Sequence, residues 1–271
     1  MNWKHSLLDK NLGKSLFRLA FSASCFLLVI TAYGQGSQNV KLMVDDPRPV
    51  AKFAELLEGK YGWIITYEDP LYENQSDIMD VTLKVRRDLD KYPPGQAPKV
   101  LIPKGGKLEV NYQVMPSTNR PSDPIVVMQK VLEAQATSDN GGRFRLEKAG
   151  RGVHIIPDTI KNKEGKWTQQ RPVLDILVTL SSGEKTVLKK LEDLCVILSR
   201  ATNLQIGLGA YPTMFGQLKD RKGAKNQRAR EVLLDTFTAL GDSANLSWQL
   251  LYDPGVKMYL LNIYHVRRQG D

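Results

Sequence analysis

The chain has 271 residues, of which 42% are hydrophobic and 25% are charged. This is an ordinary globular composition, and the length suffices for two domains of roughly 100 residues each. The formal net charge of +9 falls to +6 once the first 35 residues are left out, and no five or six like charges run together. A mild surplus without a basic cluster favours a solvated basic surface and argues against nucleic-acid binding.

The first 35 residues have the pattern of an export signal. A basic segment ending at Arg18 precedes an apolar run over residues 19–33, and small residues stand at Ala32 and Gly34, where a signal peptidase would read them. The run is shorter than the ~20 residues that span a bilayer. We therefore predict a cleaved signal peptide over residues 1–35 and a periplasmic protein. The alternative is an uncleaved segment that anchors the protein in the inner membrane, facing the periplasm, and only then does the chain contact a membrane.

Residues 36–157 are predicted to form a first α+β domain. Its order is strand, helix, strand, then strand, helix, hairpin, with a Pro-rich insertion over residues 68–106 that reads as a surface loop, the alternative being a strand at 81–85 within it. Pro124 behind Ser122 or Asp123 marks a helix start. The other expected elements are strands at 40–44, 63–67, 107–114, 143–147 and 152–156, and a helix that opens at Asp46 or Pro47 and carries Val50, Phe53, Ala54, Leu56 and Leu57 as its apolar stripe.

The second half is predicted to repeat this order after a polar linker at 158–172. Residues 173–271 form the second domain, in which an irregular connection at 209–226 leaves no clear strand before the last helix. Asp253-Pro254-Gly255 supplies the turn of the final hairpin. The expected elements are strands at 174–180 and 203–208, a helix at 185–202, a helix ending before Gly241 and hairpin strands at 247–252 and 257–264. Repetition at about a hundred residues indicates duplicated domains.

Two segments suggest a family. The element order, together with the sequences of residues 48–58 (RPVAKFAELLE) and 229–237 (AREVLLDTF), resembles the short N-terminal domain of secretins and TonB receptors. The resemblance covers most of both halves and rests on packing positions. It implies compact periplasmic α+β domains that contact other envelope proteins, without catalytic residues. The chain departs from the family by its long insertion and by having no barrel or secretin-ring segment after the domains.

The residues offer little chemistry. His154 and His265 lie in strands without a cysteine or carboxylate at metal-ligand spacing, and we predict that they point to solvent. The acidic segment 67–73 reads as a solvated strand end, since it lacks the spacing and glycine of a calcium loop. Cys195 is the only cysteine after the leader, so no internal disulfide is expected and the thiol reads as a buried apolar group. No catalytic, cofactor-binding or metal-binding residue is predicted.

We therefore look for function in the surfaces that could contact another molecule. Tyr211, Met214 and Phe215 lie in a segment without periodicity and are candidate partner contacts, unless they fold back as a lid on the domain's own core. Sheet edges offer a second mode of contact. We predict a non-catalytic periplasmic module that docks to an outer-membrane or secretion/transport component. The alternative is binding of a small molecule or glycan in the cleft between the halves, and the third hypothesis is an enzyme using Asp, Glu or Tyr residues that only the fold brings together.

Overall fold

The structure is a computed structural model that describes residues 37–138, 141–150, 152–241 and 244–267. The predicted signal segment, residues 1–35, lies outside the described residues. In the described part the protein has an α+β fold, as predicted, with helices and strands in mixed sheets.

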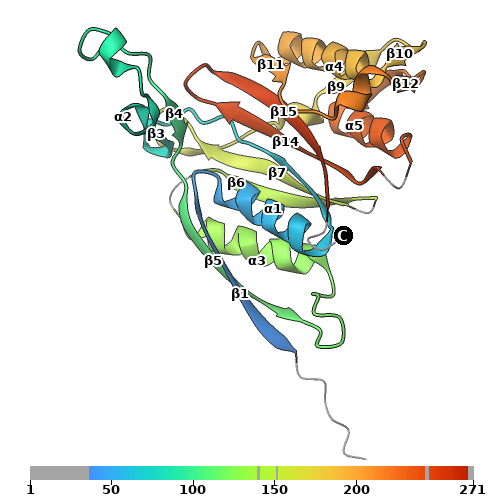
Figure 1. The fold of residues 1–271 in the computed structure, drawn as a ribbon, viewed down its shortest axis with the longest axis horizontal. Coiled ribbons are helices and arrows are strands. Elements are labelled where there is room, and N and C mark those ends of the chain that lie inside the picture. Colours follow the sequence, from blue (N-terminus) through green and yellow to red (C-terminus); the bar gives the residue numbers. More distant parts are fainter. Residues whose placement is uncertain (1–36, 139–140, 151, 242–243, 268–271) are drawn as a thin grey trace, which may run out of the picture. The chain divides into compact units, whose positions relative to one another are not determined.

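Both halves follow the predicted order of strand, helix, strand, then strand, helix, hairpin (Figure 1). The first half has β1 (Gln38–Asp46), α1 (Pro49–Tyr61), β2 (Ile64–Glu68), β5 (Gly106–Val114), α3 (Pro124–Ala136), β6 (Arg143–Ala149) and β7 (Gly152–Lys161). The second half has β9 (Leu177–Leu180), α4 (Val187–Thr202), β11 (Gln205–Leu208), β13 (Ala224–Arg228), α5 (Ala229–Thr238), β14 (Leu246–Asp253) and β15 (Met258–His265).

One central sheet runs through both halves. Its strand order is β11-β15-β14-β2-β7-β6, with β8 (Trp167–Gln169) paired to β7. The halves join where β14 pairs with β2 in parallel, Gln249 opposite Tyr67. Residues 36–271 accordingly form one compact unit, so the segments predicted as separate domains, 36–157 and 173–271, share a sheet. The predicted linker, 158–172, holds the end of β7 and all of β8.

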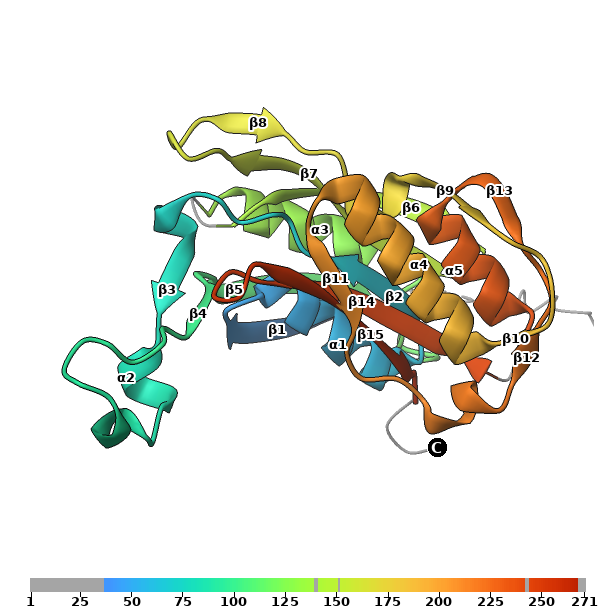
Figure 2. The same ribbon diagram turned by 90° about the horizontal axis from the view of Figure 1, so that it is seen from above.

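Each half places its two helices between this sheet and a two-stranded ribbon (Figures 1 and 2). The first ribbon is β1 with β5, and the second is β9 with β13. Alternation along β14 divides the core: Leu250 packs on the side of α4 and α5, whereas Leu251 packs on the side of α1 and α3. The halves therefore use opposite faces of the shared sheet.

Local signals explain where the helices begin and end. Asp123 caps α3, because its Oδ1 accepts a hydrogen bond from the Ile125 N–H, and Pro124 takes the first helical position. Thr186 caps α4 in the same way through the Lys189 N–H. Helices α1 and α4 end at left-handed residues, Gly62 and Asn203.

Three sequence predictions of elements are wrong. Residues 81–85 are predicted as part of a surface loop, with a strand as the alternative, but Thr82–Val85 form the short helix α2. Its start is held by Asp80 Oδ1, which accepts a hydrogen bond from the Thr82 N–H. The strand predicted at 174–180 begins only at Leu177, because Val173–Asp175 form a 3₁₀ turn. A strand not expected before the last helix, β13, is supplied by its pairing with β9.

Candidate functional site

Buried ion pairs join the two halves near the end of β2. Arg230 of α5 donates to Glu68 across 2.6 Å, and both side chains are buried. Arg48, just before α1, contacts Asp69 at 2.6 Å and also donates to the Tyr252 carbonyl of β14. The acidic segment 67–73 was predicted as a solvated strand end. That prediction is wrong for Glu68 and Asp69, whose cationic partners come from elsewhere in the chain.

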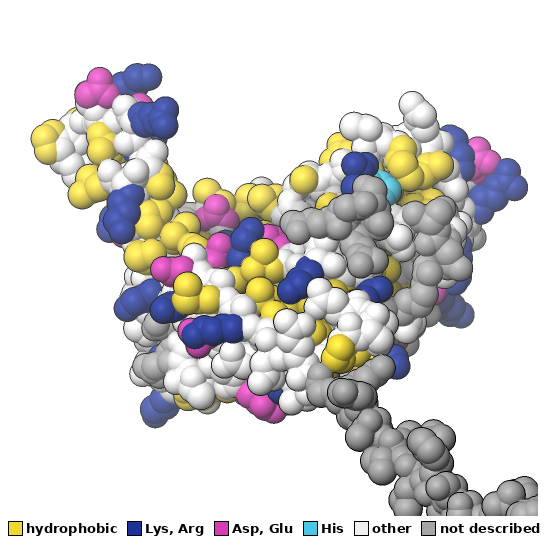
Figure 3. All heavy atoms as spheres, turned by 60° about the horizontal axis from the view of Figure 1, so that its bottom comes forward, with side chains coloured by type: hydrophobic (Ala, Val, Ile, Leu, Met, Phe, Trp, Pro, Cys, Tyr) yellow, Lys and Arg dark blue, Asp and Glu magenta, His cyan; other side chains and the backbone are white. Residues whose placement is uncertain are grey.

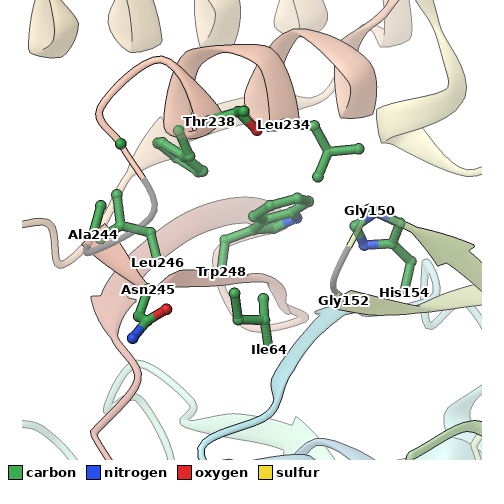
Figure 4. Close-up of a pocket in the computed structure, with 12 residues that line it drawn as sticks. Ile64, Gly150, Gly152, His154, Leu234, Thr238, Ala244, Asn245, Leu246 and Trp248 are labelled. Carbon is green, nitrogen blue, oxygen red and sulfur yellow. The ribbon is translucent and has the colours of Figure 1, made fainter.

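A pocket of about 310 Å³ opens at the same junction (Figure 4). Its walls are mostly apolar, with a few polar side chains and three glycines. We call it the junction pocket; it is lined by Ile64, Gly150, Gly152, His154, Leu234, Phe237, Thr238, Gly241, Ala244, Asn245, Leu246 and Trp248. The first four come from the first half and the others from the second, so the pocket exists only because the halves share a sheet.

His154 lies on β7 at the wall of this pocket. The prediction that it points to solvent is wrong, because its side chain is buried opposite Thr66 in the β2–β7 pairing. Burial, together with the positive charges of Arg230 and Arg228, lowers the pKa of His154 from 6.5 to about 3, and burial is the largest cause. The imidazole is therefore neutral at physiological pH. Its Nδ1 is hydrogen-bonded to Thr66 Oγ1.

Trp248 lies on β14, with its ring centroid 5.2 Å from that of His154. Figure 4 shows both rings at the pocket wall, with the indole nitrogen on the side that faces His154. The buried Trp248 Nε1 and His154 Nε2 have no hydrogen-bond partner among the described residues. Buried polar groups are normally paired, so two unpartnered nitrogens in one pocket wall mark it as a place where a partner is missing.

A second feature is an arm formed by residues 78–103. Strands β3 (Ile78–Asp80) and β4 (Leu101–Pro103) make its stem, and α2 and a 3₁₀ turn at Leu89–Lys91 lie beyond it. The arm projects from the body in both ribbon views (Figures 1 and 2) and carries hydrophobic side chains among basic ones (Figure 3). Leu83 is 84% exposed and Val85 54%. The arm also encloses a hollow of about 470 Å³ beside α2.

The structure separates the three side chains predicted as partner contacts. Tyr211 and Met214 are 39% and 38% exposed, so both reach the surface. Phe215 is fully buried and stacks on Phe237, with ring centroids 6.0 Å apart. The lid interpretation therefore holds for Phe215, which is not available to a partner in this structure.

Sheet edges differ in how open they are. The end strand β11 has part of its edge covered, since the Ile206 N–H donates to Ser199 Oγ at 3.0 Å. Strand β1 pairs with β5 over nine residues, and its other edge has no partner strand in the described part of the chain. The open edge of β1 keeps strand addition as a contact mode.

Two further residues considered from the sequence are Cys195 and His265. Cys195 is buried, as predicted, and burial raises the pKa of its thiol to about 12. His265 is exposed, with Nδ1 2.8 Å from the Ala244 carbonyl. Among the described residues, no three His, Cys, Asp or Glu side chains are grouped to hold a metal, and no helix is long and apolar enough to cross a membrane.

Sequence reasoning missed His154, Thr66 and Trp248 as a group. They come from β7, β2 and β14, and only the strand pairings bring them together. No spacing signal in the sequence links the three. The exposed apolar residues of the arm had a signal, because an apolar pair at 83 and 85 stands inside a Pro-rich insertion. No protein-family model, curated protein or solved structure matches the chain, so the resemblance to the secretin and TonB-receptor domain stays a prediction.

Proposed function

We propose that this protein is a non-catalytic interaction module of the bacterial cell envelope that docks to an outer-membrane or secretion/transport component. The observation that carries this proposal is the arm, which stands away from the body (Figures 1 and 2) and presents Leu83 and Val85 to solvent. Full burial of one leucine side chain is worth about 1.5–3 kcal/mol, so a partner that covers both residues gains a substantial part of a binding free energy.

The arm's hydrogen bonding supports a preformed contact element. Arg86 donates to Asp88 at 2.9 Å and to the Pro98 carbonyl at 2.8 Å, and Thr82 Oγ1 accepts from the Val100 N–H. These bonds hold α2 against the returning chain. A partner therefore meets an ordered apolar surface and loses little conformational entropy on ordering it.

The compartment is part of the proposal. The basic segment, apolar run and small residues of positions 1–35 favour export to the periplasm, with an uncleaved inner-membrane anchor as the alternative. The N-terminal sequence of the protein purified from its own cells distinguishes the two, because a cleaved chain would begin near Gln35. The family resemblance agrees with this compartment and with docking to envelope proteins.

A second function, binding of a small molecule or glycan between the halves, is favoured by the junction pocket. Its volume falls at the lower end of the range for ligand sites, and its apolar walls with a few polar groups are typical of them. This function does not compete with docking, because the arm and the pocket are formed by different residues.

Crosslinking and pull-down from envelope fractions test docking. The full chain carries a tag after Asp271, and the arm variant carries Leu83→Ser and Val85→Ser. The matched control carries Tyr211→Ser and Met214→Ser, two surface residues of similar exposure to each other that lie on a different element. We expect the unchanged protein and the control to recover the same specific envelope protein, and the arm variant to lose it.

Other outcomes reassign the surface or reject the proposal. Loss with the control and retention with the arm variant would move the contact to the segment around Tyr211. If both variants still recover the envelope protein, neither surface is the contact, and the open edge of β1 becomes the candidate. Recovery of no specific protein by the unchanged chain would refute docking.

A further inference from the structure

The junction pocket holds two buried hydrogen-bonding groups that the protein itself leaves without partners. Trp248 Nε1 and His154 Nε2 meet no acceptor or donor among the described residues, and both side chains are almost completely buried. Leaving such a group unpaired costs about 1–3 kcal/mol. A molecule that supplies the missing partner recovers this free energy in addition to the apolar area it buries.

Thr66 decides which kind of partner His154 needs. The Thr66 hydroxyl has His154 Nδ1 as its hydrogen-bond partner. When the hydroxyl donates to Nδ1, both groups are satisfied and the single proton of the neutral ring sits on Nε2. The opposite arrangement would leave the Thr66 hydroxyl proton without an acceptor among the described residues. The imidazole therefore presents an N–H, as the indole always does, and the missing partner is an acceptor.

The charges around the pocket favour a neutral acceptor. Arg230, the cation that acts most strongly on His154, is paired with Glu68 at 2.6 Å and with Asp175 at 3.2 Å. Its Nη1 has no hydrogen-bond partner among the described residues, but Arg230 does not line the pocket. Arg228 is paired with Glu231 and Glu147. His154 is itself neutral. A carboxylate or phosphate brought into the pocket would thus lose its hydration without gaining an unpaired cation.

The side chains that line the pocket restrict the chemical nature of the rest of the ligand. Side chains of Ile64, Leu234, Phe237, Leu246 and the Trp248 ring provide apolar contact, whereas Thr238 and Asn245 are the polar side chains besides His154. A sugar ring brings several hydroxyl donors, for which this wall offers few acceptors. A largely apolar body fits the wall better.

We propose that the junction pocket binds a small, largely apolar molecule that carries a neutral hydrogen-bond-accepting oxygen, such as a carbonyl group, received by the N–H groups of Trp248 and His154. This inference rests on the second function named above and not on docking. Both nitrogens are buried in side chains that line the pocket, so the proposal includes a small ring rotation that brings each N–H to the ligand.

The tautomer of His154 is the first test. Nitrogen-15 NMR of the full chain distinguishes a protonated Nε2 from a protonated Nδ1, and we expect the proton on Nε2. Thr66→Val removes the hydroxyl that fixes this tautomer and should let the Nδ1–H form appear. A proton on Nδ1 in the unchanged protein would overturn the assignment of a donor pair.

Binding is tested with a matched set of probes at equal concentration. Acetophenone carries an aromatic body and one carbonyl, ethylbenzene has nearly the same shape without the acceptor, benzoate adds a negative charge, and N-acetylglucosamine represents a glycan. The signal of the Trp248 indole N–H reports contact directly. We expect acetophenone to shift this signal and to bind about two- to tenfold more tightly than ethylbenzene, the effect of one hydrogen bond.

Variants separate the N–H from the apolar wall. Trp248→Phe keeps an aromatic ring and removes the donor, and it should weaken acetophenone binding while leaving ethylbenzene binding nearly unchanged. Trp63→Phe is the control, since Trp63 packs on Tyr61 against the core of the first half and does not line the pocket. Equal binding of acetophenone and ethylbenzene, or no shift with any probe, would indicate a pocket filled by water alone and refute the proposal. Tighter binding of benzoate or of the sugar would refute the neutral, apolar ligand class.

Discussion

Replacing Glu68 by Ala should destabilise both halves together. Glu68 of β2 accepts from Arg230 of α5 and, through its other oxygen, from the Val173 and Leu174 N–H groups. The variant leaves the Arg230 charge buried with only Asp175 as a partner and leaves two backbone N–H groups unpaired. Removing one member of a buried ion pair costs about 3–5 kcal/mol. We expect this loss in the free energy of unfolding.

Urea unfolding followed by tryptophan fluorescence and by far-ultraviolet circular dichroism measures the effect. Because the shared sheet joins the halves, both signals should change in one transition. Lys222→Ala is the matched control: its ion pair with Asp235 is as short, 2.6 Å, but exposed, and such pairs contribute at most about 1 kcal/mol. Glu68→Gln, which keeps the shape of the side chain and one accepting oxygen but removes the charge, should fall between the two. A Glu68→Ala variant no less stable than Lys222→Ala, or separate transitions of the halves, would refute the reasoning.

Two further predictions concern buried side chains. Burial raises the pKa of Glu58 from 4.5 to about 7, so between these values the folded protein holds more protons than the unfolded chain and is stabilised as the pH falls. Relative to Glu58→Gln, the free energy of unfolding of the unchanged protein should therefore rise by about 2–3 kcal/mol between about pH 8 and about pH 5, measured by urea unfolding. If the difference in the free energy of unfolding between the two proteins did not change with pH, this pKa would be wrong. Phe215→Ala should lower the free energy of unfolding by about 3–5 kcal/mol because the Phe215 ring is fully buried, whereas Met214→Ala should lower it by less than about 1 kcal/mol. Thermal unfolding measures both losses. Losses of similar size would show that Phe215 is not a core residue.

The element order could be predicted because its signals are local. Proline at the first turn of α3 and the left-handed Gly62 after α1 act within a few residues of their own positions. Strand β13 gave no such signal: its sequence, Ala-Lys-Asn-Gln-Arg, is polar, and pairing with β9 makes it a strand. Tertiary context overrides weak strand propensity in this way.

The junction could not be predicted, because its residues acquire their environment from distant parts of the chain. Glu68 and Asp69 have the composition of a solvated strand end until Arg230 and Arg48 are placed beside them. His154 likewise reads as a solvent-facing strand histidine until β2 and α5 cover it. The sequence therefore predicts that a cleft lies between the halves, but not which side chains line it.

The parallel pairing of β2 with β14 sets the order in which the protein can fold. The Ser247 hydroxyl donates to the Ile65 carbonyl, and these residues are 182 positions apart in the chain. During synthesis, the side of β2 that β14 will occupy stays open until nearly the whole chain has left the ribosome. An unpaired strand edge invites pairing with other chains, and contacts of such long sequence separation form slowly. The first half therefore has to wait for the last hairpin before its sheet is closed, and the exposed edge of β2 can pair with other chains until then.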